Sequence, residues 1–336
     1  MLKVGIIGAG FMGSMHTAVY SHLPDVNIVG IADIRGEKVK ALTKKFKTIP
    51  YFDAQQLLDK EDISMIDVCL PTYMHKEFVI KAAERGKDVI CEKPIALTVE
   101  DANEMIEACE KNRVRLMIGH VVRFFPEYQI LKEAYDRKKY GELLTLSCRR
   151  LSPLPTWGWE DWLLDSNKSG GAILDLHIHD TDFLSYLLGK PKKIYSKTNS
   201  KGLPYAHVHT TFTFDNDLIV TAEGAWDYPA NFPFEATYIA KFEKATITFN
   251  SGNNPSVVIY EAAGKIEKPT FGKMQTENAG GNVDDLGGYF YELRYFVDHI
   301  IHNKPGNIVL PENARDSLAI VLKEKESADT GKEITL

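Results

Sequence analysis

Two side chains that can move protons, Asp175 and His179, stand four residues apart in the second half of the chain. Apolar spacing predicts one helix over residues 171–188, and residues four apart lie on the same face of a helix. Histidine titrates near neutral pH and suits proton removal from an alcohol, while a neighbouring carboxylate can orient its ring. The pair therefore predicts a general acid/base site, with a structural histidine on a buried helix as the alternative.

A lysine adds a third group with a chemical role. Lys93 follows a predicted strand from Val89 to Cys91 and precedes Pro94, which favours an extended conformation before it. Ligands of doubly wound sheets bind beyond the carboxyl ends of the strands, so a lysine there could hydrogen-bond a substrate hydroxyl and stabilise a developing alkoxide. A solvated lysine at a strand end is the alternative.

A glycine-rich turn after the first predicted strand indicates a dinucleotide site. Its glycines form the G-x-G-x-x-G pattern, a helical segment follows, and Asp33 ends the next strand. The helix N-terminus favours phosphate, and the glycines permit a tight turn and a close approach to it. Asp33 would bind the ribose hydroxyls and repel a 2′-phosphate, which favours NAD over NADP, although Arg35 keeps NADP open. The predicted contacts are Gly8, Gly10, Phe11, Met12, Gly13, Asp33 and Arg35.

The pattern of predicted secondary structure changes near residue 122. Up to about residue 122, short β-branched strands alternate with amphipathic helices, which predicts a parallel sheet covered on both faces. Further along, consecutive short strands joined by polar turns predict antiparallel pairing. We therefore predict an α/β protein: a doubly wound Rossmann domain over residues 1–122 and an α+β domain with a large, open, mainly antiparallel sheet over residues 123–336. The last helix is a candidate for packing back on the first domain.

Composition excludes several classes of protein. The 336 residues are 44% hydrophobic and 26% charged, as in a folded globular protein, and the net charge of −6 argues against binding nucleic acid or an anionic membrane. Four dispersed cysteines without a C-x-x-C pair indicate reduced thiols. The sequence shows neither a leader segment nor an apolar run of the ~20 residues that a membrane span needs. We therefore expect a soluble, cytoplasmic protein.

Four further motifs, with the glycine-rich turn, resemble those of the Gfo/Idh/MocA family of glucose-fructose oxidoreductases and inositol dehydrogenases. The resemblance spans essentially the whole chain and implies an NAD(P)-dependent dehydrogenase that acts on a CH–OH group of a sugar, cyclitol or related polyol. It also implies that the second domain forms a homodimer or homotetramer through its sheet. The motifs are Leu70-Pro71-Thr72-Tyr73-Met74-His75, Cys91-Glu92-Lys93-Pro94, the segment from Ser169-Gly170-Gly171 to His179, and Pro311 at the start of a late helix.

The same resemblance implies roles for individual residues. His179 would be the general acid/base, Asp175 its partner and Lys93 the third catalytic residue. Glu92 and Lys93 would also contact the cofactor. On the nicotinamide side it implies Pro71, Thr72 and His75, although His75 could instead only begin a helix.

Three more residues are candidate substrate contacts. Arg123, near the predicted domain junction, could clamp a substrate oxygen or make a structural ion pair. Trp157 and Trp159 offer flat indole faces that suit sugar surfaces, with burial in a core or in a subunit contact as the alternative.

A metal site is an alternative for the histidines. His177 with His179, and His207 with His209, form two H-x-H pairs, and Asp182 lies nearby. The position of His177 is more often small or apolar in the family. Because hydride transfer needs no metal and an ion would compete for His179, we predict no metal.

Two rival functions stay open for a chain with these motifs. One is an NAD-dependent glycosidase that uses transient oxidation to cleave a glycosidic bond. The other is a non-catalytic NAD-binding regulator, which could lose Lys93, Asp175 or His179, whereas all three are present.

Overall fold

The computed structural model of the chain describes residues 1–199, 201–215, 217–272 and 286–336. The chain divides into two compact units. The first comprises Met1–Phe124 with Lys273–Asp316, and the second comprises Phe125–Gly272 with Ser317–Leu336. Within the described ranges, every helix is too short or too polar to span a membrane.

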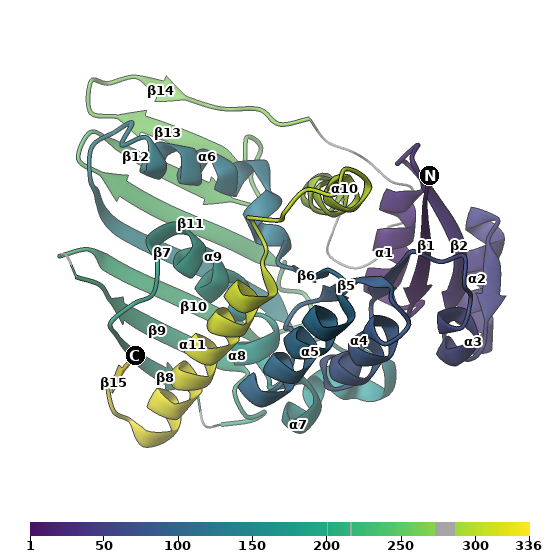
Figure 1. The fold of residues 1–336 in the computed structure, drawn as a ribbon. Helices are drawn as coiled ribbons and strands as arrows, with labels where there is room; N and C mark the ends of the chain where they lie inside the picture. The colour runs from purple at the N-terminus through teal and green to yellow at the C-terminus, as the bar shows by residue number, and fades with distance from the viewer. Residues whose placement is uncertain (200, 216, 273–285) are drawn as a thin grey trace. The chain divides into compact units, whose positions relative to one another are not determined.

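The first unit contains a parallel sheet of six strands in the order β3-β2-β1-β4-β5-β6, as the described residues define it. Each neighbouring pair runs parallel. This order changes direction between β1 and β4, as in the Rossmann fold, and it confirms the predicted doubly wound sheet (Figure 1). The strands are β1 (Leu2–Ile7), β2 (Val26–Ala32), β3 (Ile49–Tyr51), β4 (Met65–Val68), β5 (Asp88–Glu92) and β6 (Leu116–Gly119).

Helices cover both faces of this sheet because successive side chains of each strand point to opposite sides. On one face, Val4 and Ile6 share a core with Met15 of α1 and Phe296 of α10. On the other face, Gly5 lies against side chains from the segment around α3. The helices are α1 (Phe11–Tyr20), α2 (Gly36–Phe46), α3 (Ala54–Leu58), α4 (His75–Ala83), α5 (Val99–Asn112) and α10 (Gly287–Ile301), with short 3₁₀ turns η1 (Thr72–Met74) and η2 (Val121–Phe124).

The second unit contains a nine-stranded sheet in the order β14-β13-β12-β11-β7-β10-β9-β8-β15, again for the described residues. It confirms the predicted open, mainly antiparallel sheet. One detail of the prediction is wrong: β10 and β11 are consecutive in the chain, yet β7 lies between them and runs parallel to β10. The strands are β7 (Leu143–Pro153), β8 (Lys193–Thr198), β9 (His207–Thr213), β10 (Ile219–Tyr228), β11 (Glu235–Phe242), β12 (Ala245–Asn250), β13 (Val257–Glu261), β14 (Ile266–Glu267) and β15 (Ile334–Thr335).

Helices lie on one face of this sheet, where α6, α9 and α11 cross the strands (Figure 1). The strands alternate buried and exposed residues, so the opposite face is open to solvent. The helices are α6 (Pro126–Asp136), α7 (Ser166–Ser169), α8 (Ala172–Asp175), α9 (Ile178–Leu188) and α11 (Pro311–Thr330), with the 3₁₀ segment η3 (Trp159–Leu164).

Candidate active site

The glycine-rich turn joins β1 to α1 and has a backbone that only glycine allows at two positions. Gly8 has a φ of +109°, and a Cβ there would overlap the carbonyl oxygen of Cys69. A Cβ on Gly13 would overlap the carbonyl oxygen of Gly8, so α1 packs directly on the turn. The turn is therefore held tightly against the sheet.

The outer side of the turn is open. A Cβ on Gly10 would meet no atom closer than Nη2 of Arg35, at 3.6 Å. Phe11 and Met12 form the first turn of α1 and pack, half buried, against the core of the unit. The N-cap residue of this helix is Gly10, so no side chain caps its N-terminus. A helix N-terminus with this access suits a phosphate group, so the turn fits the pyrophosphate of a dinucleotide.

The carboxylate of Asp33, directly after β2, accepts four hydrogen bonds. Oδ1 accepts from the amide and Nε of Arg35, at 2.8 and 2.9 Å, and Oδ2 accepts from the amide of Ala9 and Nη2 of Arg35, at 2.7 and 2.6 Å. Burial alone would raise the pKa of Asp33, but the bonds from Arg35 and Ala9 lower it. Because a carboxylate offers about four acceptor positions, ribose hydroxyls could bind here only in place of the Arg35 guanidinium.

Lys93 lies immediately after β5, at the carboxyl edge of the sheet. Its main-chain amide donates to Oε2 of Glu92 at 3.2 Å, and the peptide bond to Pro94 is cis. The predicted cofactor residue Glu92 thus turns its carboxylate inward and is itself buried.

The segment after β4 carries the other predicted nicotinamide contacts. Pro71 is half buried and Thr72 is buried in η1. His75 begins α4 and is fully buried; its Nδ1 lies 2.9 Å from the carbonyl oxygen of Pro94 and its Nε2 lies 2.8 Å from that of Leu70. Burial lowers its pKa. His75 therefore ties the loop after β4 to the residue that follows Lys93.

A buried polar cluster that our sequence analysis missed lies between α1, β4 and β5. Nδ1 of His16 is 2.8 Å from Oδ2 of Asp67, and the Sγ of Cys69 donates to Oδ1 of the same carboxylate at 3.3 Å. Burial alone would lower the pKa of His16, but the charge of Asp67 and the contact with Cys69 raise it well above 6.5. The signal in the sequence that could have revealed the cluster is Asp67, an acidic residue in the otherwise apolar strand β4.

The same cluster is the one place in the described ranges where three possible metal ligands meet. Ligand atoms of His16, Asp67 and Cys69 lie within 4.8 Å of one another. Each of these atoms is already in a hydrogen bond with another, and burial raises the pKa of the Cys69 thiol, which opposes the thiolate that a metal prefers. We therefore describe it as a hydrogen-bond network.

The helix predicted over residues 171–188 is in fact two helices, α8 and α9, and this corrects the argument from spacing. The amide of His177 donates to the carbonyl of Ala172, five residues back, and that of His179 to Leu176, three residues back. Asp175 ends α8 and His179 lies in the first turn of α9, so one regular helix does not relate the two side chains. Both side chains are half buried.

Buried polar contacts hold α9 in place. Nε2 of His177 lies 2.7 Å from Oε2 of Glu324 on α11, and the same carboxylate accepts from Thr181 at 2.7 Å. Arg150 makes a two-pronged ion pair with Asp180, at 2.9 and 3.0 Å. His179 thus lies on a helix that is fixed by the His177–Glu324 hydrogen bond and the Arg150–Asp180 ion pair.

The remaining predicted substrate contacts differ in exposure. Arg123 is only 2% exposed and donates to the carbonyl oxygen of Ile308, which is a structural contact. Trp157 is 62% exposed and Trp159 is half buried. Their neighbour Trp162 packs on a small apolar cluster with Trp226.

The histidines of the two H-x-H pairs have separate surroundings. His177 pairs with Glu324, as described above. His207 lies 3.0 Å from Glu223 and 3.2 Å from Asp227, on the open face of the sheet. His209 is exposed on the same strand.

The first unit, with its strand order, glycine-rich turn and acid at the end of β2, is an NAD-binding Rossmann domain. Residues 2–120 match an oxidoreductase family with an NAD-binding Rossmann fold, and residues 128–248 match the Gfo/Idh/MocA C-terminal domain. The chain belongs to the Gfo/Idh/MocA oxidoreductase family, as its motifs predicted.

Two curated relatives illustrate the range of similarity. An uncharacterized oxidoreductase of Bacillus subtilis is 30% identical over 236 residues, which cover 67% of each chain. A myo-inositol 2-dehydrogenase of Thermotoga maritima is 31% identical over 56% of this chain and 55% of its own. The chain spans little more than half the length of several curated relatives that it matches.

A solved structure shares the whole fold. Levoglucosan dehydrogenase in complex with NADH and levoglucosan matches 100% of this chain and 99% of its own, with a TM-score of 0.87 and 22% identity. The likeness extends over both units and establishes the fold.

Stability should depend on pH through His16. The folded chain holds the proton of this ring more tightly than the unfolded chain does, so the charged ring stabilises the fold fully below about pH 6.5 and less as the pH rises through the raised pKa. Above pH 6.5 we expect the unfolding free energy of the wild type to fall relative to that of His16→Gln, by up to about 1.4 kcal/mol per pH unit. Urea unfolding at several pH values measures this difference, and parallel pH dependences would contradict a charged ring.

Proposed function

We propose that this protein is an NAD-dependent dehydrogenase that oxidises a secondary alcohol of a sugar, cyclitol or related polyol. The observation that carries the proposal is the Asp33 carboxylate, which lies at the end of β2 and accepts the amide of Ala9 in the glycine-rich turn. A carboxylate that can accept hydrogen bonds from ribose hydroxyls thus lies beside a turn that suits a pyrophosphate. The similarity to a myo-inositol 2-dehydrogenase supports the substrate class.

The proposed chemistry assigns one task to each of three side chains. The Lys93 ammonium donates a hydrogen bond to the reacting oxygen and favours its negative charge. His179 takes the hydroxyl proton on Nε2, since its Nδ1 is buried, and Asp175 favours the protonated ring that results. Bound NAD supplies the acceptor for the hydride of the alcohol carbon.

Cofactor choice follows from the charge beside the ribose site. A 2′-phosphate would approach the ionised carboxylate of Asp33, which opposes NADP, whereas Arg35 would attract it. Because the carboxylate is the group that would accept the ribose hydroxyls, its charge would lie closest to a 2′-phosphate, and we propose that NAD is preferred.

The catalytic assignment predicts two kinetic losses. We expect Lys93→Met and His179→Asn each to lower kcat by about 10²- to 10⁴-fold, because each removes a group that acts on the reacting oxygen. NADH formation across a panel of sugars, inositols and sugar acids identifies a substrate and then measures both variants. The exposed residues Lys44 and His302 supply the matched controls Lys44→Met and His302→Asn, which should keep the wild-type rate.

Three results would contradict this proposal. Wild-type rates in both variants would remove the catalytic assignment. Release of nitrophenol from a nitrophenyl glycoside, with the cofactor retained and no net NADH formed, would favour the glycosidase instead. The absence of any turnover by a chain that binds NAD would favour the regulator.

The ribose site predicts a change of cofactor preference. Asp33→Ser removes the repelling carboxylate and frees Arg35, so we expect the ratio of NAD to NADP affinity to shift towards NADP by at least about tenfold. Arg35→Ala should shift the ratio in the opposite direction. Dissociation constants from titration calorimetry test both variants, and an unchanged ratio in Asp33→Ser would show that this carboxylate does not select the cofactor.

We further propose that the protein is a cytoplasmic homo-oligomer, a dimer or tetramer, that assembles through the open face of the second unit's sheet. This face exposes apolar residues from three strands: Ile219 is 61% exposed, Ile239 54% and Tyr260 46%. Exposed apolar groups on a flat sheet favour self-association. The four cysteines are all free and buried, which supports a reducing compartment.

Oligomerisation predicts a response to one charge on that face. Ile239→Lys should lower the molar mass measured by size-exclusion chromatography with light scattering, because an unpaired lysine would be buried in the contact. Ile49→Lys is the matched control, since Ile49 is 53% exposed and lies on β3 of the first unit. A monomeric wild type would refute the proposal.

A further inference from the structure

The ring of His16 lies between two carboxylates in the interior of the first unit. Nδ1 is 2.8 Å from Oδ2 of Asp67 on β4, and Nε2 is 3.0 Å from Oε1 of Glu92 at the end of β5. The hydroxyl of Tyr20, one turn further along α1, donates to the same oxygen of Asp67 at 2.9 Å. The side chains of His16 and Asp67 are fully buried, and that of Glu92 is 8% exposed.

The two contacts of the ring differ in kind. Nδ1 is hydrogen-bonded to Asp67, whereas Nε2 and Oε1 of Glu92 are within ion-pair distance but lack hydrogen-bond geometry. A negative carboxylate beside each nitrogen favours the protonated, positively charged imidazole. In this dry interior a charge that loses its partner is strongly destabilising. His16 therefore holds Asp67 and Glu92 in fixed orientations.

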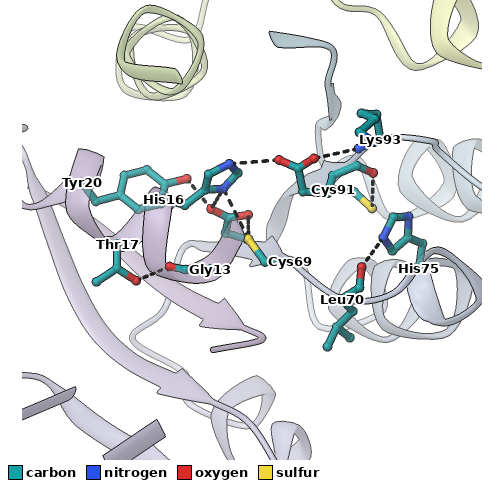
Figure 2. A network of polar contacts seen from close by, with 11 residues as sticks. Gly13, His16, Thr17, Tyr20, Cys69, Leu70, His75, Cys91 and Lys93 are labelled. Atoms are coloured by element: carbon teal, nitrogen blue, oxygen red, sulfur yellow. Dashed lines mark hydrogen bonds and ion pairs between the residues drawn. The ribbon is translucent and has the colours of Figure 1, made fainter. Parts of the chain in front are cut away.

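The carboxylate of Glu92 in turn contacts the backbone of Lys93. Its second oxygen, Oε2, accepts the main-chain amide of Lys93 at 3.2 Å (Figure 2). On the side of β6 there is little spare space, because a Cβ on Gly119 would lie only 3.2 Å from Oε1. The chain direction at Lys93 is thus set where β5 ends, by a group that His16 holds.

On its other side, His16 is linked through α1 to the phosphate-binding turn. His16 lies on α1, and Thr17 beside it donates its hydroxyl to the carbonyl of Gly13 at 2.5 Å, as Figure 2 shows. A continuous series of contacts therefore runs from the turn through α1, His16 and Glu92 to the amide of Lys93.

We propose that His16 is a positioning residue for Lys93: by holding Glu92, it fixes the backbone from which the Lys93 ammonium reaches the substrate. This inference rests on the proposed dehydrogenase function. The dinucleotide contacts themselves do not include His16, so its loss should affect the chemical step more than cofactor binding.

The first test separates rate from binding. In His16→Gln, which retains one donor but no charge, we expect kcat to fall by about 10- to 100-fold, since a displacement of about 1 Å has effects of that size. The dissociation constant for NADH, measured by fluorescence titration, should change by less than about threefold, because the main-chain donors of the turn are intact.

Tyr20→Phe is the matched control. It removes one hydrogen bond to the same Asp67 oxygen from the same helix but does not touch Glu92. The lost hydrogen bond should lower the melting temperature of this variant, whereas its kcat should stay within about twofold of that of the wild type. If Tyr20→Phe lowers kcat as much as His16→Gln does, the effect belongs to the stability of the cluster and the proposal is overturned.

A second variant preserves the test if His16→Gln does not fold. Glu92→Gln has nearly the shape of the native side chain, but it removes the negative charge beside the His16 ring and leaves one acceptor oxygen in place of two. Either the ring or the Lys93 amide then loses its contact with an oxygen, and the same fall in kcat should follow. A folded Glu92→Gln with the wild-type kcat would refute the proposal.

A double-mutant cycle shows whether His16 acts through Lys93. Once Lys93→Met has removed the ammonium, adding His16→Gln should lower kcat by no more than about twofold. An equal further loss would mean that His16 acts independently of Lys93 and would overturn the inference while leaving the dehydrogenase intact. A wild-type rate in Lys93→Met alone would instead refute the role of Lys93 in the proposed function.

Discussion

The carboxyl ends of parallel strands meet at one edge of a sheet, and the proposed cofactor site depends on this constraint. In this protein β1 leads into the turn at Gly8, β2 into Asp33, β4 into Pro71 and β5 into Lys93. Because the strand order changes direction between β1 and β4, the loops from the two halves of the sheet open on the same side. Four short segments that are distant in the sequence thus converge without any further element.

Buried charges then set the fine positions that the sheet alone leaves free. The ring of His16 fixes α1 against β4 and β5, while Arg150 and Glu324 fix α9 in the second unit. Ion pairs of this kind add little net stability, since the cost of removing both charges from water nearly cancels their attraction. Their effect is on orientation, because a helix that rotates or slides leaves a charge without a partner in a dry interior.

The first unit was largely predictable from the sequence because its signals are local: a glycine pattern after a strand, an acid at the end of the next strand, and alternating strands and helices. The second unit was less so. Nothing local shows that β7 separates β10 from β11, since antiparallel strand order depends on contacts across the whole sheet. The break between α8 and α9 involves His177, whose partner Glu324 lies 147 residues further along the chain. The partners of His16 were missed for the same reason.

The four hydrogen bonds on Asp33 also bear on how quickly a dinucleotide leaves. In the ribose site that we propose, hydroxyls would have to replace the Arg35 guanidinium on this carboxylate, and the gain in free energy would be only the difference between two sets of bonds. A smaller gain means a shorter residence time, and product release limits turnover in many enzymes. A guanidinium that returns to its carboxylate would speed the departure of the spent cofactor, which suits an enzyme that exchanges NAD in every cycle.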